Sequence, residues 1–243
     1  MFDAVFVSDV HLSAEVPVRT AAFVSFLRRL RTHKLYILGD LFDFWVGSDH
    51  AHLFRESGLF NALAYLKSMG TRIFLLPGNR DFLIPYTASH IFSAQILPET
   101  HTINSPYGRT LLLHGDQLLL NDVEYTLFRF CSRRKTLHLL YSLLPFGLRI
   151  WIASLMRQQS KSAVKRKRHR SPRILHFSRT ALSSLLRQGF RCVICGHIHR
   201  TSKYLFSAGN ATLHIYVLGQ WTQDGGDFLA LNSGKLIFHT FRP

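Results

Sequence analysis

Five short polar clusters follow apolar runs in this chain, and together they contain carboxylate, imidazole and amide side chains. The clusters are Asp9-x-His11, Gly39-Asp40-x-x-Asp43, Gly78-Asn79-Arg80-Asp81, His114-Gly115-Asp116 and Gly196-His197-x-His199. These ligand types suit two divalent cations such as Mn²⁺, with one carboxylate shared between them. A pair of metal ions favours in-line displacement at phosphorus. The clusters therefore predict a phosphoesterase.

Each cluster taken alone has a simpler explanation. An Asp-x-His pair arises by chance, Gly-Asn usually marks a turn, and an Asp after a strand can act as a cap. Their joint placement favours a site, because each cluster directly follows a short apolar run typical of a buried strand. The runs are Phe2–Ser8, Leu35–Leu38, Ile73–Leu76, Leu111–Leu113 and Cys192–Cys195. We expect the clusters to meet along one edge of a sheet, where α/β proteins commonly bind ligands.

Apolar residues at helical spacing lie between the first three of these strands. They fall in Val18–Arg31 and Leu59–Met69, and Gly70 then stands in a C-cap position. This alternation of strands and helices predicts an α/β fold. By contrast, residues 117–172 show no strand pattern and predict two or three helices.

The composition fits one domain with a basic surface. The chain has 243 residues, and 47% of them are hydrophobic, which is enough for one sizeable core. We therefore expect a single domain over residues 1–243. The formal net charge of +16 indicates partners that carry phosphate, namely nucleic acid, an anionic membrane or phosphorylated small molecules. A solvated basic face is the alternative explanation.

The cysteines indicate a reducing compartment. There are three of them, Cys131, Cys192 and Cys195, and no signal peptide is recognisable before Phe2. The Cys192-x-x-Cys195 pair has a redox spacing, but it lies inside an apolar strand. We therefore expect both thiols to pack in the core.

The order of the five clusters resembles the pattern D-x-H, G-D-x-x-D, G-N-H-[ED], H, G-H-x-H of the calcineurin-like metallophosphoesterases. The resemblance implies a two-sheet sandwich flanked by helices. It implies a first metal site made of Asp9, His11, Asp40 and His199, and a second made of Asp40, Asn79, His114 and His197. Asp40 would bridge the ions, and a water activated by both would be the nucleophile.

One departure from that pattern is informative. Members of the superfamily generally carry His after Gly-Asn, where it can protonate the leaving group, whereas this chain has Arg80. Arg holds its proton at neutral pH and offers a fork of donors to phosphate oxygens. A phosphate leaving from a pyrophosphate needs little acid assistance and fits this change. The block Gly78–Leu83 is similar to the one found in the UDP-2,3-diacylglucosamine diphosphatases of the lipid A pathway.

The similarity to that branch covers nearly the whole chain. It includes Tyr36–Trp45, Asn121–Arg129, Ser160-Lys161 and Val217–Trp221. By the resemblance, the residues with catalytic roles are Asp40, Asn79, Arg80 and His114. The residues that contact substrate are Asn79, Arg80, Asp122, Tyr125, Ser160, Lys167 and His197. Lys167 lies within the run Lys165–Arg168, where any of four cations could serve, and Leu119–Asp122 departs from the family's stretch.

The resemblance also implies an activity and a place of work. The activity is hydrolysis of the pyrophosphate bond of UDP-2,3-diacylglucosamine, which yields UMP and 2,3-diacylglucosamine 1-phosphate. Two Mn²⁺ ions per chain are implied, although Fe²⁺, Co²⁺ and Zn²⁺ suit the same ligands. The protein would act as a monomer, bound peripherally to the anionic cytoplasmic face of the bacterial inner membrane, without nucleic acid.

Residues 137–156 are almost wholly apolar. Their length would allow a membrane span, but Pro145, Gly147 and Arg149 argue against one. A buried helical hairpin and an exposed apolar cap are the remaining alternatives. Basic residues at 133–135 and 161–173 flank the stretch, as in proteins that lie on anionic bilayers. We expect residues 117–172 to form a helical lid over the metals that binds the acyl end of the substrate.

The C-terminal part predicts one helix and then strands. The helix covers residues 173–188 and ends at Gly189, and the strands are Lys203–Phe206, Ala211–Leu218, Phe228–Leu231 and Lys235–Phe241. Turn residues at 209–210 and 232–234 separate them. We expect an antiparallel tail that completes the second sheet.

The residue types and their spacing are also compatible with two other functions. One is a different calcineurin-like phosphodiesterase or a nuclease, although Arg80 and the apolar stretch disfavour it. The other is a binding module with a structural metal, although such a site is normally closed by protein ligands. Asp43 and Asp116 are expected to support the metal ligands from behind, with turn capping as the alternative. His50-x-His52 is expected to lie outside any metal site.

Overall fold

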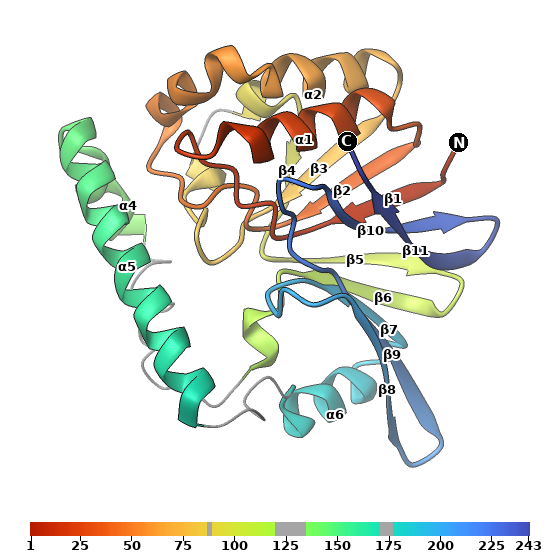
Figure 1. Cartoon of the computed structure of the whole chain (residues 1–243). Coiled ribbons are helices and arrows are strands. Elements are labelled where there is room, and N and C mark those ends of the chain that lie inside the picture. Colours follow the sequence, from red (N-terminus) through yellow and green to blue (C-terminus); the bar gives the residue numbers. More distant parts are fainter. Residues whose placement is uncertain (87–88, 120–134, 171–176) are drawn as a thin grey trace.

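The computed structural model describes the backbone of residues 1–86, 89–119, 135–170 and 177–243, and their side chains apart from 86, 89, 135–137 and 159–170. Two β-sheets pack against each other, and helices cover their outer faces (Figure 1). The architecture confirms the expected α/β sandwich.

The first sheet has six strands in the order β11-β10-β1-β2-β3-β4. Its strands are β1 (Ala4–Val7), β2 (Lys34–Leu38), β3 (Arg72–Leu76), β4 (Gln95–Ile96), β10 (Gly226–Asn232) and β11 (Lys235–Phe241). Strands β1 to β4 run parallel, and β10 pairs antiparallel with both β1 and β11.

The second sheet has five strands in the order β5-β6-β7-β9-β8. They are β5 (Thr100–Ser105), β6 (Gly108–Leu113), β7 (Cys192–Cys195), β8 (Ser202–Ala208) and β9 (Ala211–Val217). The central strands β6, β7 and β9 are parallel. Cys192 and Cys195 are both buried in β7 as free thiols, which confirms their place in the core.

The prediction that an antiparallel tail completes the second sheet is confirmed for one hairpin and wrong for the other. The β8–β9 hairpin joins the second sheet, whereas the β10–β11 hairpin pairs with β1 of the first. The link between the hairpins contains buried Trp221, whose N–H donates to the Asp9 carbonyl at 3.1 Å. Alternating hydrophobicity predicts that one face of each strand is buried. Because a strand of either sheet buries one face, this pattern does not determine which sheet a strand joins.

Three apolar layers hold these elements together. One lies between the first sheet and the helices α1 (Pro17–Arg29) and α2 (Leu59–Ser68), the second lies between the sheets, and the third lies under α6 (Arg179–Arg187). Helix α6 begins later than predicted, because the Ser178 hydroxyl caps it by accepting from the Ala181 N–H. The short 3₁₀ segments are Ser48–Ser57, Ile84–Tyr86, Ser89–Phe92 and Asp116–Leu118.

The apolar stretch 137–156 falls on two helices, α4 (Lys135–Ser142) and α5 (Phe146–Arg170), which lie along one side of the sandwich (Figure 1). Its large side chains are mostly exposed, with Leu143 at 73% and Trp151 at 58%. Of the two alternatives, the structure therefore has the exposed apolar cap. Within the described residues, no helix is both long enough and apolar enough to cross a membrane.

Candidate metal centre

The five polar clusters meet where strand ends of the two sheets face each other. The clusters follow β1, β2 and β3 of the first sheet and β6 and β7 of the second, so the expectation of one sheet edge is wrong. The loops are joined directly: the Asp9 N–H donates to the Gly39 carbonyl at 3.3 Å, and the His197 N–H donates to Asp9 Oδ2 at 2.8 Å. The sequence marks the strand ends, but it does not show that the chain changes sheets between β4 and β5.

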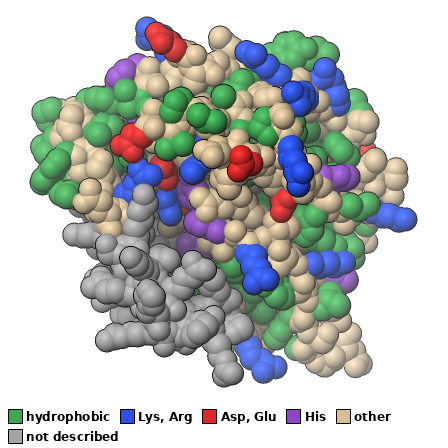
Figure 2. All heavy atoms as spheres, in the orientation of Figure 1, with side chains coloured by type: hydrophobic (Ala, Val, Ile, Leu, Met, Phe, Trp, Pro, Cys, Tyr) green, Lys and Arg blue, Asp and Glu red, His purple; other side chains and the backbone are tan. Residues whose placement is uncertain are grey.

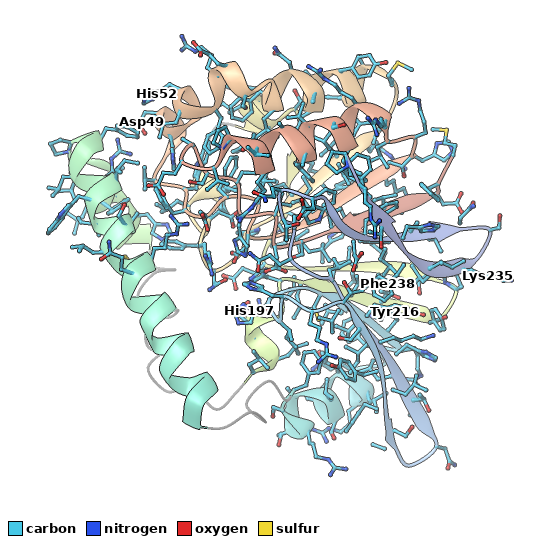
Figure 3. The ribbon with its side chains drawn as sticks, in the orientation of Figure 1. Asp49, His52, His197, Tyr216, Lys235 and Phe238 are labelled. Carbon is cyan, nitrogen blue, oxygen red and sulfur yellow. The ribbon has the colours of Figure 1, made fainter. Side chains whose placement is uncertain are left out.

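A first group of candidate ligands consists of Asp9, His11 and His199. One ligand atom from each lies within 4.8 Å of the others. His199 Nε2 lies 3.2 Å from Asp9 Oδ1 and 3.2 Å from His11 Nε2. Figure 3 shows the neighbouring His197 at the junction between the two sheets. The group matches three of the four ligands that the resemblance implies for the first metal.

A second group surrounds His114. Its Nε2 lies 3.6 Å from Asp40 Oδ2, 2.9 Å from the Asn79 side-chain amide and 3.3 Å from His197 Nδ1. The Asp40 carboxylate also lies 3.9 Å from His11 Nδ1, so it stands between the two groups as a bridging ligand would. Asp9 reaches the second group as well. The structure thus brings all seven predicted metal residues together.

The donor and acceptor pattern around His114 tests whether this centre fits a cation. Nδ1 lies 2.9 Å from the Leu38 carbonyl, to which it must donate, so the neutral ring directs the lone pair of Nε2 into the centre. That lone pair faces the Asp40 carboxylate, and the Asn79 side chain satisfies both groups only with its NH₂ turned toward them, 2.9 Å from Nε2 and 3.0 Å from Asp40 Oδ2. The buried His11 Nδ1 has no hydrogen-bond partner among the described residues and lies 3.9 Å from Asp40 Oδ2. A cation would satisfy this nitrogen and the carboxylate together, so the residues fit the metals that the family implies.

A proton can take the place of that ion. Burial alone would lower the pKa of His114, but Asp40, Asp9 and Asp116 outweigh it and raise the pKa to about 9. Burial, reinforced by the charges of Asp81 and Asp9, raises the pKa of Asp40 to about 7. Metal binding must therefore displace protons from this pair.

The imidazoles of His197 and His11 are neutral near pH 7. Burial lowers the pKa of His197 to about 4, with the charge of His114 acting in the same direction. Burial and then the charge of Arg80 hold the pKa of His11 well below its ordinary value. Burial would raise the pKa of Asp9, but the His199 hydrogen bond and the nearby histidines hold it well below its usual range. These three residues need no proton loss to bind a cation near neutral pH.

Five of the candidate ligands adopt left-handed backbone conformations. The φ angles are 53° for Asp9, 53° for His11, 52° for Asp40, 70° for His197 and 61° for His199. Each such non-glycine residue costs on the order of 1–3 kcal/mol, so the surrounding hydrogen bonds must hold it in place. Strain of this kind concentrates at functional sites, and its repetition here supports that assignment.

Glycines in the clusters let carboxylates approach the neighbouring loops. A Cβ at Gly78 would lie 2.2 Å from Asp40 Oδ1, and one at Gly196 would lie 2.2 Å from Asp9 Oδ2. Gly39 has a φ of +81°, and a Cβ there would lie 2.6 Å from the Gly78 Cα. Glycine is therefore required at these positions for steric reasons.

Asp81 has a structural role that the sequence did not reveal. Its carboxylate accepts N–H bonds from Asp40 at 3.2 Å, Leu41 at 2.7 Å, Phe42 at 3.3 Å and Gly78 at 2.7 Å. It therefore holds the loop after β2 against the loop after β3. The only sequence cue was its place at the end of the Gly-Asn-Arg-Asp cluster.

Arg80 and Asp43 lie beside the candidate ligands. The Arg80 N–H donates to Asp40 Oδ1 at 3.0 Å, and its side-chain Nε lies 3.4 Å from Asp40 Oδ2. Asp43 Oδ1 accepts from Arg80 Nη1 at 3.2 Å and lies 3.9 Å from His11 Nδ1. Asp116 is buried, and its charge contributes to the pKa values of His114 and His197.

The remaining predicted substrate contacts are not placed. Asp122 and Tyr125 lie outside the described residues. Ser160 and Lys167 belong to α5, in the part whose side chains are not described. His50, as expected, lies away from this centre, where it stacks on Phe44 and Trp45.

The fold and this centre place the chain in the class of metallophosphoesterases. A family model described as calcineurin-like phosphoesterase matches residues 3–201. The chain therefore belongs to the calcineurin-like phosphoesterase family.

Three curated relatives share one name. The UDP-2,3-diacylglucosamine hydrolase of Serratia proteamaculans is 34% identical over 227 residues, covering 92% of each chain. The proteins of the same name from Yersinia pestis and Proteus mirabilis are 35% and 33% identical, and each alignment covers at least 90% of both chains. Among solved structures, Vps29 of Chaetomium thermophilum is similar over the full length of both chains with a TM-score of 0.43 and 11% identity, which is too distant for inferences about the site.

Proposed function

We propose that this protein hydrolyses the pyrophosphate bond of UDP-2,3-diacylglucosamine to UMP and 2,3-diacylglucosamine 1-phosphate. The observation that most supports this proposal is the position of Arg80. It lies against Asp40, where the superfamily pattern has a proton-donating His. The relatives named for this substrate support the proposal because they match the chain over nearly its whole length.

We assign two Mn²⁺ ions to the centre. Asp9, His11, Asp40 and His199 would hold one ion, and Asp40, Asn79, His114 and His197 the other. When bound, such ions lower the pKa of water and offset charge on phosphoryl oxygens. The mixture of carboxylate, imidazole and amide ligands suits Mn²⁺ without excluding other borderline cations.

Arg80 supplies electrostatic stabilisation at the phosphate. Its guanidinium keeps its charge throughout the reaction and offers several N–H donors to oxygens whose charge grows as the bond breaks. It cannot deliver a proton to the leaving group. A sugar 1-phosphate leaves without that proton, which makes a pyrophosphate a suitable substrate for this arrangement.

The helical cap is the proposed binding surface for the acyl chains. We propose that residues 117–172 form a lid within the single domain of residues 1–243, and that the lid also rests on the anionic cytoplasmic face of the inner membrane. Leu139, Leu140, Leu143 and Trp151 are exposed on its described part. Hydrophobic side chains gather on this side of the molecule (Figure 2), and the net charge of +16 favours an anionic surface.

Removing the apolar character of the cap should weaken binding of the lipid substrate. Because burial of one large apolar side chain is worth about 1.5–3 kcal/mol, the double variant Leu143→Glu/Trp151→Glu should raise KM for the lipid nucleotide by at least about tenfold. Hydrolysis of bis(p-nitrophenyl) phosphate should be unchanged. Tyr65→Glu, at an exposed position on α2, is the control. Equal losses on both substrates would contradict an acyl-binding cap.

The activity itself is tested by metal removal and replacement. The chelated protein is expected to release no UMP from UDP-2,3-diacylglucosamine, and Mn²⁺ added alone is expected to restore release. In ¹⁸O-labelled water the label should enter UMP, because water attacks the phosphorus on the uridine side. Absence of UMP with Mn²⁺, Co²⁺, Fe²⁺, Zn²⁺ and Mg²⁺ supplied in turn would overturn the proposal, and label in the sugar phosphate would overturn the position of attack.

A further inference from the structure

One arginine of the cap helix reaches the metal centre through a carboxylate. Arg157 Nη2 on α5 donates to Asp43 Oδ2 at 2.6 Å, and the two side chains are 19% and 5% exposed. Such a partly buried charge pair is stronger than a pair on the open surface, because water screens it less. Arg157 also lies 3.4 Å from Glu15, whose side chain is 73% exposed, so this second contact contributes little.

Asp43 divides its two oxygens between two arginines. While Oδ2 accepts from Arg157, Oδ1 accepts from Arg80 at 3.2 Å, and Arg80 in turn lies 3.4 Å from Asp40. The charges alternate from the cap helix to the predicted bridging ligand. Both guanidinium groups are therefore positioned by one carboxylate.

A second arginine attaches α5 to the same loop. Arg149 lies about two helical turns before Arg157, so the two side chains emerge from the same face of α5. Arg149 Nη1 donates to the Val46 carbonyl at 2.6 Å, and its guanidinium pairs with Asp49. Asp49 lies beside the N-terminal part of α5 in Figure 3. The loop that follows β2 thus carries Asp40 and also receives the cap helix.

We propose that Arg157 is a positioning residue that acts through Asp43 to hold Arg80 in place for phosphate. Without Arg157, the buried Asp43 carboxylate would retain Arg80 as its only described cationic partner within salt-bridge distance. Arg80 would then neutralise Asp43 instead of the phosphate, and uncompensated negative charge would lie beside an anionic substrate. This inference rests on the proposed role of Arg80 in the phosphoesterase reaction.

A double-mutant cycle of Arg157→Gln and Asp43→Asn tests this coupling. Arg157→Gln should lower kcat/KM about tenfold, the effect of a coupling typical of close charge pairs. The loss should fall on kcat, because Arg80 offsets charge that grows in the transition state. Arg157→Lys should recover part of the rate, and Glu15→Gln, which removes only the exposed contact, should behave as wild type. In the Asp43→Asn background, Arg157→Gln should change kcat less than about twofold.

Two kinetic outcomes would overturn the inference. If the two single losses multiply in the double variant, Arg157 contacts the substrate directly and does not act through Asp43. If only KM rises and Lys rescues nothing, Arg157 serves as a mechanical anchor of α5. Both outcomes can be read with bis(p-nitrophenyl) phosphate as well as with the lipid nucleotide.

Amide hydrogen exchange provides a readout without turnover. Arg157→Gln should speed exchange in α5 over residues 146–158 and in the loop of residues 39–49, and Glu15→Gln should leave both unchanged. Unchanged exchange in Arg157→Gln would overturn the coupling. A wild-type protein that releases no UMP would remove the proposed function alone, because the exchange experiment still decides whether α5 and the loop are linked.

Discussion

Asp40→Asn is expected to abolish turnover without unfolding the protein. The carboxylate lies 3.6 Å from His114 and 3.9 Å from His11, so it belongs to both halves of the centre. An amide in its place carries no charge to offset the two dications proposed for this centre. Because metal ions supply several kcal/mol of transition-state stabilisation, the expected loss in kcat/KM is about a thousandfold or more. Steady-state kinetics and the metal content per chain together measure the effect.

The same substitution should not lower the stability of the chelated protein at alkaline pH. Burial first, and then Asp81 and Asp9, raise the pKa of Asp40 to about 7 from the ordinary value of 3.8. Between these values the folded chain binds a proton that the unfolded chain releases, so this contribution to the free energy of unfolding falls as pH rises from 3.8 to about 7 and is lost above it. At pH 8 the buried carboxylate is ionised, which lowers the free energy of unfolding, and a neutral Asn side chain removes this destabilisation.

Thermal unfolding with a chelator at pH 8 is the control measurement. The Asn variant should unfold at the wild-type temperature or above it, as is common when a charged functional group is removed. A lower unfolding temperature would show that Asp40 chiefly supports the fold. A variant with wild-type metal content and turnover would remove the two-metal interpretation altogether.

The strand ends were predictable from the sequence because local chemistry determines them. Cys192–Cys195 is a strand with the predicted bounds, and Leu35–Leu38 differs from its strand by one residue. The ligands therefore follow the elements that were expected to position them. What local chemistry does not contain is the pairing between elements, because the β8–β9 and β10–β11 hairpins have similar patterns yet join different sheets.

The supports of the site were harder to predict for a related reason. Asp81 acts by accepting backbone N–H groups from residues far away in the chain, and such contacts leave no pattern in residue types. Arg149 lies within the apolar stretch, where it was interpreted only as evidence against a membrane span, and Arg157 belongs to no motif that the sequence shows. Their partners, Asp49 and Asp43, are about a hundred residues away along the chain.

Gly78→Ala is expected to inactivate the enzyme, although Gly78 is not one of the predicted metal ligands. The added methyl group would lie 2.2 Å from Asp40 Oδ1 and 2.3 Å from the Asp40 backbone nitrogen, so the loop after β2 must move. Gly78 is also tied to Asp81 by an N–H bond of 2.7 Å, which restricts its own displacement. A shift of about 1 Å at a reacting centre can cost about a hundredfold in rate. We expect at least that loss in kcat/KM, with reduced metal content.

Gly147→Ala is the matched control for this substitution. Gly147 lies near the start of α5, and a Cβ there meets nothing within 4 Å. Ala should therefore leave kcat unchanged and stabilise the protein by up to about 1 kcal/mol, since Gly is a poor helix former. In Gly78→Ala, by contrast, overpacking should cost about 1–3 kcal/mol of the free energy of unfolding. Wild-type kcat and metal content in Gly78→Ala would mean that Asp40 tolerates displacement, and the close contact between the two loops would then have no part in catalysis.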